Sequence, residues 1–201
     1  MLRFLSFLKE QAGQHHVITY MRANPPTAGH EKVVDKVLET AKKHNATHSV
    51  ILSHSQDAAK NPLSPQQKLK HAKRAFPNAN VEVSSADHPT ILHHAARAHQ
   101  AGAQHLHVVV GQDRVKQFHE LLHKYNGVQS KHGMYNFKSI TVHSAGDRDP
   151  DAEGTEGISA TKMRQAAKTG DRATFHTGAS SAMSEKHKDD LMKDVVKGMG
   201  E

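Results

Sequence analysis

Five short apolar segments alternate with segments of helical periodicity, and this alternation is the strongest constraint on the fold. The apolar segments are residues 17–21, 49–53, 81–84, 105–110 and 139–143. Between them, apolar residues recur at the spacing of an amphipathic helix. Buried strands separated by helices of roughly 10–15 residues form βαβ units, whose strands lie parallel in one sheet. The sequence therefore predicts an α/β fold: a Rossmann-like, doubly wound, parallel five-stranded sheet with flanking helices.

Helix boundaries follow from the capping residues and prolines between the apolar segments. Ser64 is a good N-cap, Pro65 suits the first helical position, and Gln67 completes a capping box. Glycine after an amphipathic segment marks a helix C-terminus. Helices are therefore expected at residues 29–44, 64–76, 90–101, 113–125 and 159–168.

The ends of the chain and one loop differ in composition from the α/β region. An α/β domain is expected over residues 1–178, with a short helix at 1–14 that packs on its body. A small-residue linker at 178–182 precedes a charged helix at 183–199, so residues 179–201 are predicted to form a C-terminal helical extension. Residues 146–157 are acidic and rich in glycine, which is typical of a mobile loop or lid.

The composition excludes several classes of protein. The 201 residues include no cysteine, which excludes disulfides, thiolate zinc sites and cysteine nucleophiles. No segment approaches the roughly 20 apolar residues of a membrane span, so we expect no membrane partner and a cytoplasmic location. The net charge is +7, and ten Lys or Arg residues against four Asp or Glu lie between Arg22 and Arg74. A phosphate-rich ligand fits this charge, whereas the low aromatic content of 4% disfavours single-strand binding by base stacking.

The first candidate phosphate-binding segment follows the first predicted strand. It reads Arg22-Ala23-Asn24-Pro25-Pro26-Thr27-Ala28-Gly29-His30. The prolines prevent the strand from continuing, and Gly29 permits close approach of a ligand to the backbone. Thr27 can cap the helix that begins here, and His30 lies in its first turn, where helix termini bind anions. A structural turn could use the same residues, so this segment alone does not identify a site.

The second candidate segment begins a helix after the acidic loop. It reads Gly157-Ile158-Ser159-Ala160-Thr161-Lys162-Met163-Arg164. The hydroxyls of Ser159 and Thr161 and the first backbone N–H groups can receive a phosphate, and Arg164 can hold two phosphate oxygens at once. A capped helix with exposed cations would look similar, so the specificity lies in the pairing of the two segments.

Taken together, the two segments resemble the HxGH-type nucleotidyltransferase superfamily, which includes nicotinamide-mononucleotide adenylyltransferases, pantetheine-phosphate adenylyltransferases and cytidylyltransferases. Residues 22–30 resemble its G-x-F-x-P-x-[HT]-x-G-H segment, and residues 158–164 resemble its I-S-x-T-x-x-R segment. Gly111-Gln112-Asp113, after the fourth predicted strand, resembles its G-x-D. The order and spacing agree over roughly residues 17–175.

The resemblance implies a role for each matching position. His30 and Thr27 would contact the α-phosphate of a nucleoside triphosphate, while Arg164 would bind the β- and γ-phosphates. The rest of the implied nucleotide-binding set consists of Arg22, Asn24, Gly29, Lys60, Gly111, Asp113, Ser159 and Thr161. The implied reaction transfers a nucleotidyl group, most favourably adenylyl from ATP, to a small phosphomonoester and releases pyrophosphate. Mg²⁺ would accompany the triphosphate. CTP is the alternative donor, and Lys68 is either a further phosphate contact or solvated surface.

Two other interpretations stay open at this point. Met21 and Ala23 stand where many members have glycine and an aromatic residue, which puts the wall of the base or substrate pocket in doubt. The fold could therefore persist as a catalytically silent nucleotide-binding or structural module. The basic first half could instead bind nucleic acid, although we expect nucleic acid less than a small ligand. The charged C-terminal helix could pack on a second copy, so a homo-oligomer is a further expectation.

Histidine pairs along the chain suggest transition-metal ligands only weakly. His15 and His16 are adjacent, as are His93 and His94, and His105 and His107 share one face of a predicted strand. With 19 histidines in the chain, such neighbours arise by chance. No resident metal site is therefore predicted.

Overall fold

The computed structural model describes residues 14–146 and 158–200. The predicted helix at 1–14 and the predicted lid at 146–157 therefore lie almost wholly outside the described residues. None of the described helices combines the length and the apolar character that a membrane span requires.

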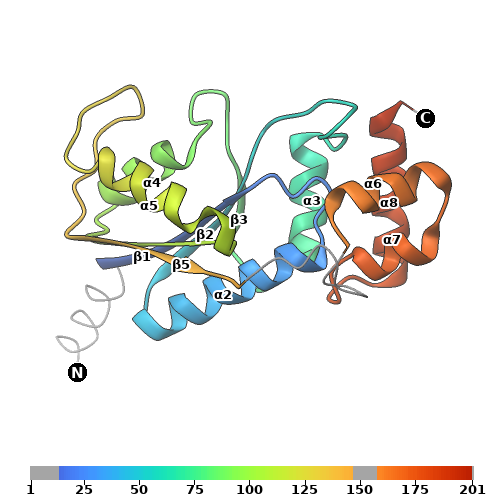
Figure 1. The fold of residues 1–201 in the computed structure, drawn as a ribbon, viewed down its shortest axis with the longest axis horizontal. Coiled ribbons are helices and arrows are strands. Elements are labelled where there is room, and N and C mark those ends of the chain that lie inside the picture. The colour runs from blue at the N-terminus through green and yellow to red at the C-terminus, as the bar shows by residue number, and fades with distance from the viewer. Residues whose placement is uncertain (1–13, 147–157, 201) are drawn as a thin grey trace.

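The centre of the structure is a parallel five-stranded sheet in the order β3-β2-β1-β4-β5, as Figure 1 shows. Each strand pairs in parallel with its neighbour. The strands are β1 (His15–Met21), β2 (Thr47–Leu52), β3 (Val81–Val83), β4 (His105–Val110) and β5 (Ser139–Ser144). The predicted fold class is confirmed, and the predicted strand boundaries differ from the observed ones by at most two residues.

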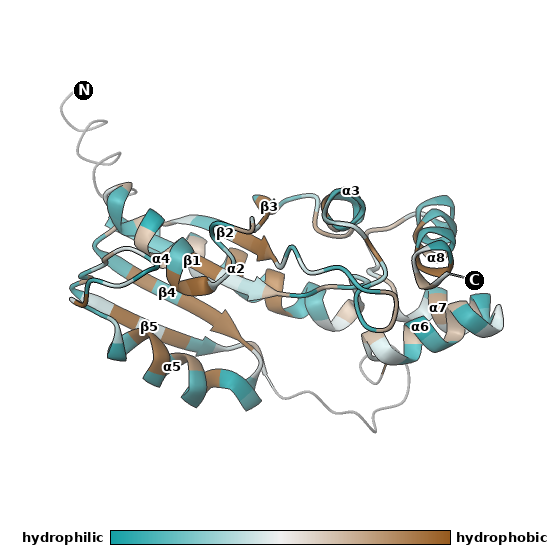
Figure 2. Cartoon of the chain, turned by 90° about the horizontal axis from the view of Figure 1, so that it is seen from above, coloured by the Kyte–Doolittle hydropathy of each residue, from teal (hydrophilic) through white to brown (hydrophobic). Residues whose placement is uncertain are grey.

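Helices cover both faces of the sheet. They are α2 (Ala28–His44), α3 (Pro65–Ala75), α4 (Ile91–Gln100) and α5 (Val115–Lys124), with the 3₁₀ helix η1 (Gln112–Arg114) before α5. Side chains alternate along a strand, so Val17 packs in the core with α2 and α3, whereas Ile18 packs in the core with α4 and α5. Figure 2 shows mostly hydrophobic strands, and helices along which hydrophobic and hydrophilic residues alternate.

Three helices follow the α/β sheet: α6 (Ala160–Thr169), α7 (Arg172–Gly178) and α8 (Glu185–Met199). Residues 172–178 were not expected to be helical. α6, α7 and α8 pack against one another beside α3 (Figure 1), and Leu191 and Val195 of α8 are fully buried in the same core as α2. The C-terminal helix of residues 185–199 is therefore continuous with the core of the sheet.

Candidate active site

The sheet changes its winding direction between β1 and β4. β1 leads into α2 on one face, and β4 leads into η1 and α5 on the other. β1 pairs with β2 as far as Met21 and Leu52, but its pairing with β4 ends at Ile18 and Val108. The two strands therefore separate before their carboxyl ends. Open α/β sheets bind ligands at such a switch point, and two of the three predicted segments, residues 22–30 and 111–113, begin here.

Thr27 and His30 form a reciprocal cap at the start of α2. The backbone N–H of His30 donates to Thr27 Oγ1 (3.3 Å), and the backbone N–H of Thr27 donates to His30 Nδ1 (3.1 Å). Thr27 Oγ1 is also 2.8 Å from the same Nδ1. Because a backbone N–H can only donate, Nδ1 must accept, so the neutral imidazole carries its proton on Nε2. The cap therefore presets His30 as a hydrogen-bond donor through Nε2.

The second segment begins α6 and is joined directly to the first. Ser159 caps α6 by accepting from the backbone N–H of Lys162 (3.1 Å). Arg164 donates through Nη1 to the backbone oxygen of Asn24 (2.9 Å) and through Nη2 to Thr161 Oγ1 (3.1 Å). The contact with Asn24 connects residues 140 positions apart and joins the two predicted phosphate-binding segments.

A positive region results from this contact between the segments. Burial, together with the nearby Arg22 guanidinium, lowers the pKa of Arg164 from its usual value, although the guanidinium stays charged at pH 7. Arg22 itself is exposed at the carboxyl end of β1. Two neighbouring guanidiniums repel each other, and a phosphate group placed between them would relieve that repulsion.

Asn24 has a supporting position in the site. Its side chain is buried, with Nδ2 donating to the backbone oxygen of Leu63 (3.2 Å) and Oδ1 accepting from the Leu63 N–H (3.0 Å). Both ends of the amide are therefore bound within the chain, which favours a positioning role for Asn24 over direct contact with a ligand. The loop that precedes α3 is held against the first segment in this way.

Lys68 is fully buried, so the interpretation of this residue as solvated surface is wrong. Its Nζ donates to the backbone oxygens of Ser53 and Ser55, the latter at 2.8 Å. Burial lowers the pKa of Lys68 to about 8, and nearby Asp57 opposes that shift. Lys68 therefore anchors the loop after β2. Lys60, in the same loop, is exposed, and its backbone N–H donates to Asp57 Oδ1 (2.6 Å).

Gly111 and Asp113 follow β4 on the other side of the switch point. A Cβ on Gly111 would lie 2.8 Å from Asp113 Oδ1, so the carboxylate folds back over the glycine. Asp113 is exposed in η1, just before α5. At Gly29, by contrast, the nearest atom to an added Cβ is Thr27 Oγ1 at 3.6 Å, an ordinary contact. Packing within the described chain therefore gives no reason for glycine at 29, and close approach of a ligand supplies one.

The two departures from the family pattern lie in the core. Met21 and Ala23 are 8% and 1% exposed and belong to the cluster beneath α2. Ala23 adopts φ 42°, in the left-handed region, where a Cβ is disfavoured. Their side chains pack against the chain itself rather than forming an open pocket wall.

The sequence segments and the fold agree with one family. A family model described as cytidylyltransferase-like matches residues 19–166, which is most of the chain and includes all three segments. No curated protein matches the sequence. The parallel sheet, the paired helix N-termini and the family match lead to one conclusion: the chain belongs to the cytidylyltransferase-like family, within the HxGH nucleotidyltransferase superfamily.

Proposed function

We propose that this protein transfers an adenylyl group from ATP to a small phosphomonoester and releases pyrophosphate. The observation that carries the proposal is the hydrogen bond from Arg164 to the backbone of Asn24. That contact joins the segment that carries the Thr27–His30 cap to the first turns of α6, and the Arg22 guanidinium lies near that of Arg164. Membership of the cytidylyltransferase-like family supports nucleotidyl transfer in general, and ATP rather than CTP is our choice of donor.

The proposed roles follow from the chemistry of each group. An oxygen of the acceptor phosphate attacks the α-phosphorus in line, and the bond from that phosphorus to the bridging oxygen breaks. His30 donates from Nε2 to an α-phosphate oxygen while negative charge develops there. Arg164 and the N-terminus of α6 receive the departing pyrophosphate. A phosphomonoester is already an anionic nucleophile, so positioning and charge stabilisation suffice.

The residues of the site fit a magnesium ion that arrives with the triphosphate. Apart from Asp113, the proposed set consists of cations, hydroxyls, an amide, an imidazole and backbone N–H groups, which do not form a carboxylate cage. Mg²⁺ commonly keeps several waters and is held largely by substrate phosphates, where it neutralises their charge.

The test combines each of the four nucleoside triphosphates with Mg²⁺ and a panel of small phosphomonoesters, and it measures pyrophosphate. We expect release with ATP and at least one acceptor. We also expect Arg164→Ala and His30→Ala to lower kcat/KM by about 100-fold, the loss typical of a removed charge-stabilising donor. Lys116→Ala is the matched control, because it removes an exposed cation from the outside of α5.

The assay distinguishes adenylyl transfer from cytidylyl transfer, from nucleotide binding without catalysis and from the absence of a site. Release with CTP alone would replace adenylyl by cytidylyl transfer. Triphosphate binding that depends on Arg164, without pyrophosphate from any acceptor, would favour a catalytically silent nucleotide-binding module. Triphosphate binding that is equal in wild type, Arg164→Ala and Lys116→Ala would reject the site itself.

A further inference from the structure

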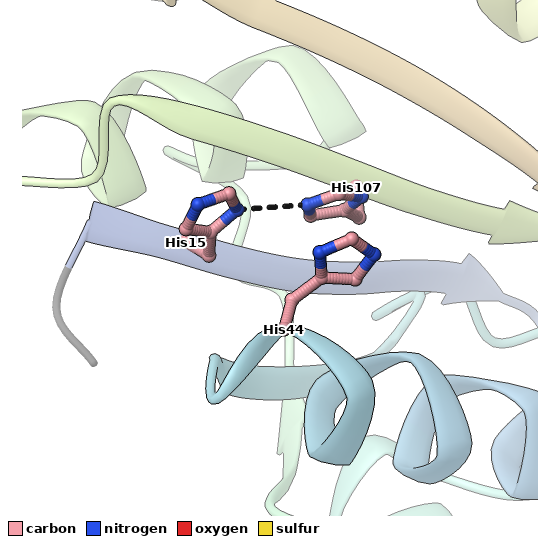
Figure 3. A group of neighbouring side chains, drawn as sticks. All are labelled: His15, His44 and His107. Carbon is pink, nitrogen blue, oxygen red and sulfur yellow. Dashed lines mark hydrogen bonds between the residues drawn. The ribbon is translucent and has the colours of Figure 1, made fainter. Parts of the chain in front are cut away.

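Three histidines from separate elements meet on one face of the sheet, away from the site described above. His15 begins β1, His44 ends α2, and His107 lies in β4. One ring nitrogen from each lies within 4.8 Å of those of the other two. Figure 3 shows the three rings gathered between the two strands and the end of the helix. Sequence spacing gives no sign of this group, because His44 joins it only through the packing of α2.

Contacts between the rings are close. His15 Nδ1 lies 3.0 Å from His107 Nε2, and the rings of His44 and His107 stack with their centroids 4.2 Å apart. His107 is buried, whereas His15 and His44 are half-buried. The metal-ligand group contains no carboxylate that would pair with a protonated imidazole. Between His15 and His107 one neutral ring must donate and the other accept, and a bound metal ion would take the place of the shared proton.

A fourth histidine supplies the support that metal-binding imidazoles usually have. His143 Nε2, from β5, lies 3.0 Å from His107 Nδ1. A metal on Nε2 of His107 would select the tautomer in which Nδ1 donates to His143, and such an outer hydrogen bond fixes both the ring orientation and the ligand atom.

We propose that His15, His44 and His107 bind one divalent transition-metal ion of the zinc class. Three imidazole nitrogens are the donors that Zn²⁺, Cu²⁺ and Ni²⁺ accept, whereas Mg²⁺ and Ca²⁺ require oxygen. Four-coordinate zinc places its ligand nitrogens about 3.3 Å apart when each bond is about 2.0 Å. Small rotations of half-buried His15 and His44 bring the nitrogens to that spacing. Three protein ligands leave one position for water or a small anion.

The ion would join three elements at the amino ends of the strands. His15 is the first residue of β1, and the phosphate-binding segment begins after Met21 at the other end of the same strand. Six residues of extended strand separate the two by roughly 20 Å. The ion would therefore act as a clamp between β1, α2 and β4, separate from the Mg²⁺ that accompanies the triphosphate.

The test measures binding of Zn²⁺ alone to the full chain, in competition with a chromophoric chelator, and of Co²⁺ by its visible absorption. We expect one equivalent of Zn²⁺ to bind more tightly than the rest and to raise Tm. His44→Gln should weaken this equivalent by at least about tenfold, since loss of a direct ligand should exceed the effect of losing an outer hydrogen bond. It should also abolish the rise in Tm and the cobalt spectrum.

The matched control is the double variant His119→Gln, His123→Gln. These two rings stack on α5 with centroids 4.0 Å apart, so they offer a two-imidazole chelate elsewhere on the surface. The control should keep the tight equivalent. His15→Gln serves as a second variant, and a metal-free thermal melt of each protein establishes that it folds. Tight binding that survives both His15→Gln and His44→Gln, or that is lost in the α5 control, would overturn the proposal.

Discussion

At the residue scale, Thr27 sets both the start of α2 and the proton position on His30. Thr27→Val keeps the shape of the side chain but removes the oxygen that accepts from the His30 N–H. We expect the free energy of unfolding to fall by about 1 kcal/mol, as for other lost N-caps. We also expect kcat/KM to fall, because His30 loses one partner of Nδ1. Urea unfolding and steady-state kinetics measure the two effects. Thr27→Ser should keep both the stability and the kcat/KM of the wild type. Unchanged stability in Thr27→Val would show that the Thr27 cap does not stabilise α2.

Gly111 offers a way to separate binding from folding. Its φ is −61°, so the backbone allows alanine. The new Cβ would lie 2.8 Å from Asp113 Oδ1, so the flexible carboxylate would have to move away. Gly111→Ala should therefore change the free energy of unfolding by less than about 0.5 kcal/mol, while weakening nucleotide binding. Calorimetric titration with ATP measures the binding. Gln112→Ala, at the exposed neighbouring position, is the control. Equal affinity in Gly111→Ala and wild type would show that the Asp113 carboxylate does not contribute to nucleotide binding.

At the scale of elements, those with a strong apolar pattern follow from the sequence. β4 spans His105–Val110 as predicted, because its last five residues are all buried. α7 was missed because Phe175 is its only large apolar residue, and its stability comes from packing on α6 and α8. A readable signal was present in Asp171, whose side chain accepts from the Thr174 N–H and caps the helix.

Gly198 shows how closely α8 supports the site. A Cβ at this position would lie 2.1 Å from the backbone oxygen of Pro62, whose neighbour Leu63 holds the side chain of Asn24. Gly198→Ala should lower the free energy of unfolding by about 1–3 kcal/mol through overpacking. It should also reduce nucleotide affinity, because the loop before α3 must move. Denaturant melts and calorimetry test both, with exposed Lys197→Ala as the control. Unchanged stability and unchanged nucleotide affinity in Gly198→Ala would show that α8 does not constrain this loop.

For the whole molecule, the sequence locates the chemistry but not the contacts that assemble it. The two candidate phosphate-binding segments are recognisable because each is local: a strand end, a cap and a helix start. The contact of Arg164 with Asn24 spans 140 residues, and the burial of Lys68 depends on how α3 meets the loop after β2. Both follow from the strand order, which local periodicity does not contain. The prediction of the fold class was therefore complete, while the supporting residues required the structure.

The dependence of stability on pH is a property of the whole molecule, and His94 contributes a defined part of it. His94 is 3% exposed on α4, and neither ring nitrogen reaches a hydrogen-bond partner among the described residues. Burial, assisted by the Arg97 guanidinium, lowers the pKa of His94 to about 4, although the Glu82 carboxylate, 3.9 Å from Nδ1, opposes the shift. The unfolded chain, with a pKa near 6.5, therefore binds more protons than the folded chain between pH 6.5 and 4. Stability must fall as the pH falls through this range.

His94→Leu should remove this contribution. The full shift corresponds to roughly 3 kcal/mol, so the wild type should lose up to that amount between pH 6.5 and 4 through His94 alone. All other groups that make stability depend on pH are common to both proteins. The pH dependence of the difference between their urea-derived free energies of unfolding therefore reports on the His94 imidazole. We expect the difference between the two curves to be constant above about pH 7 and to shift progressively in favour of the leucine variant in acid. Exposed His119→Leu on α5 is the control and should follow the wild type. Parallel curves for His94→Leu and wild type would show that this ring takes up its proton without unfolding the protein.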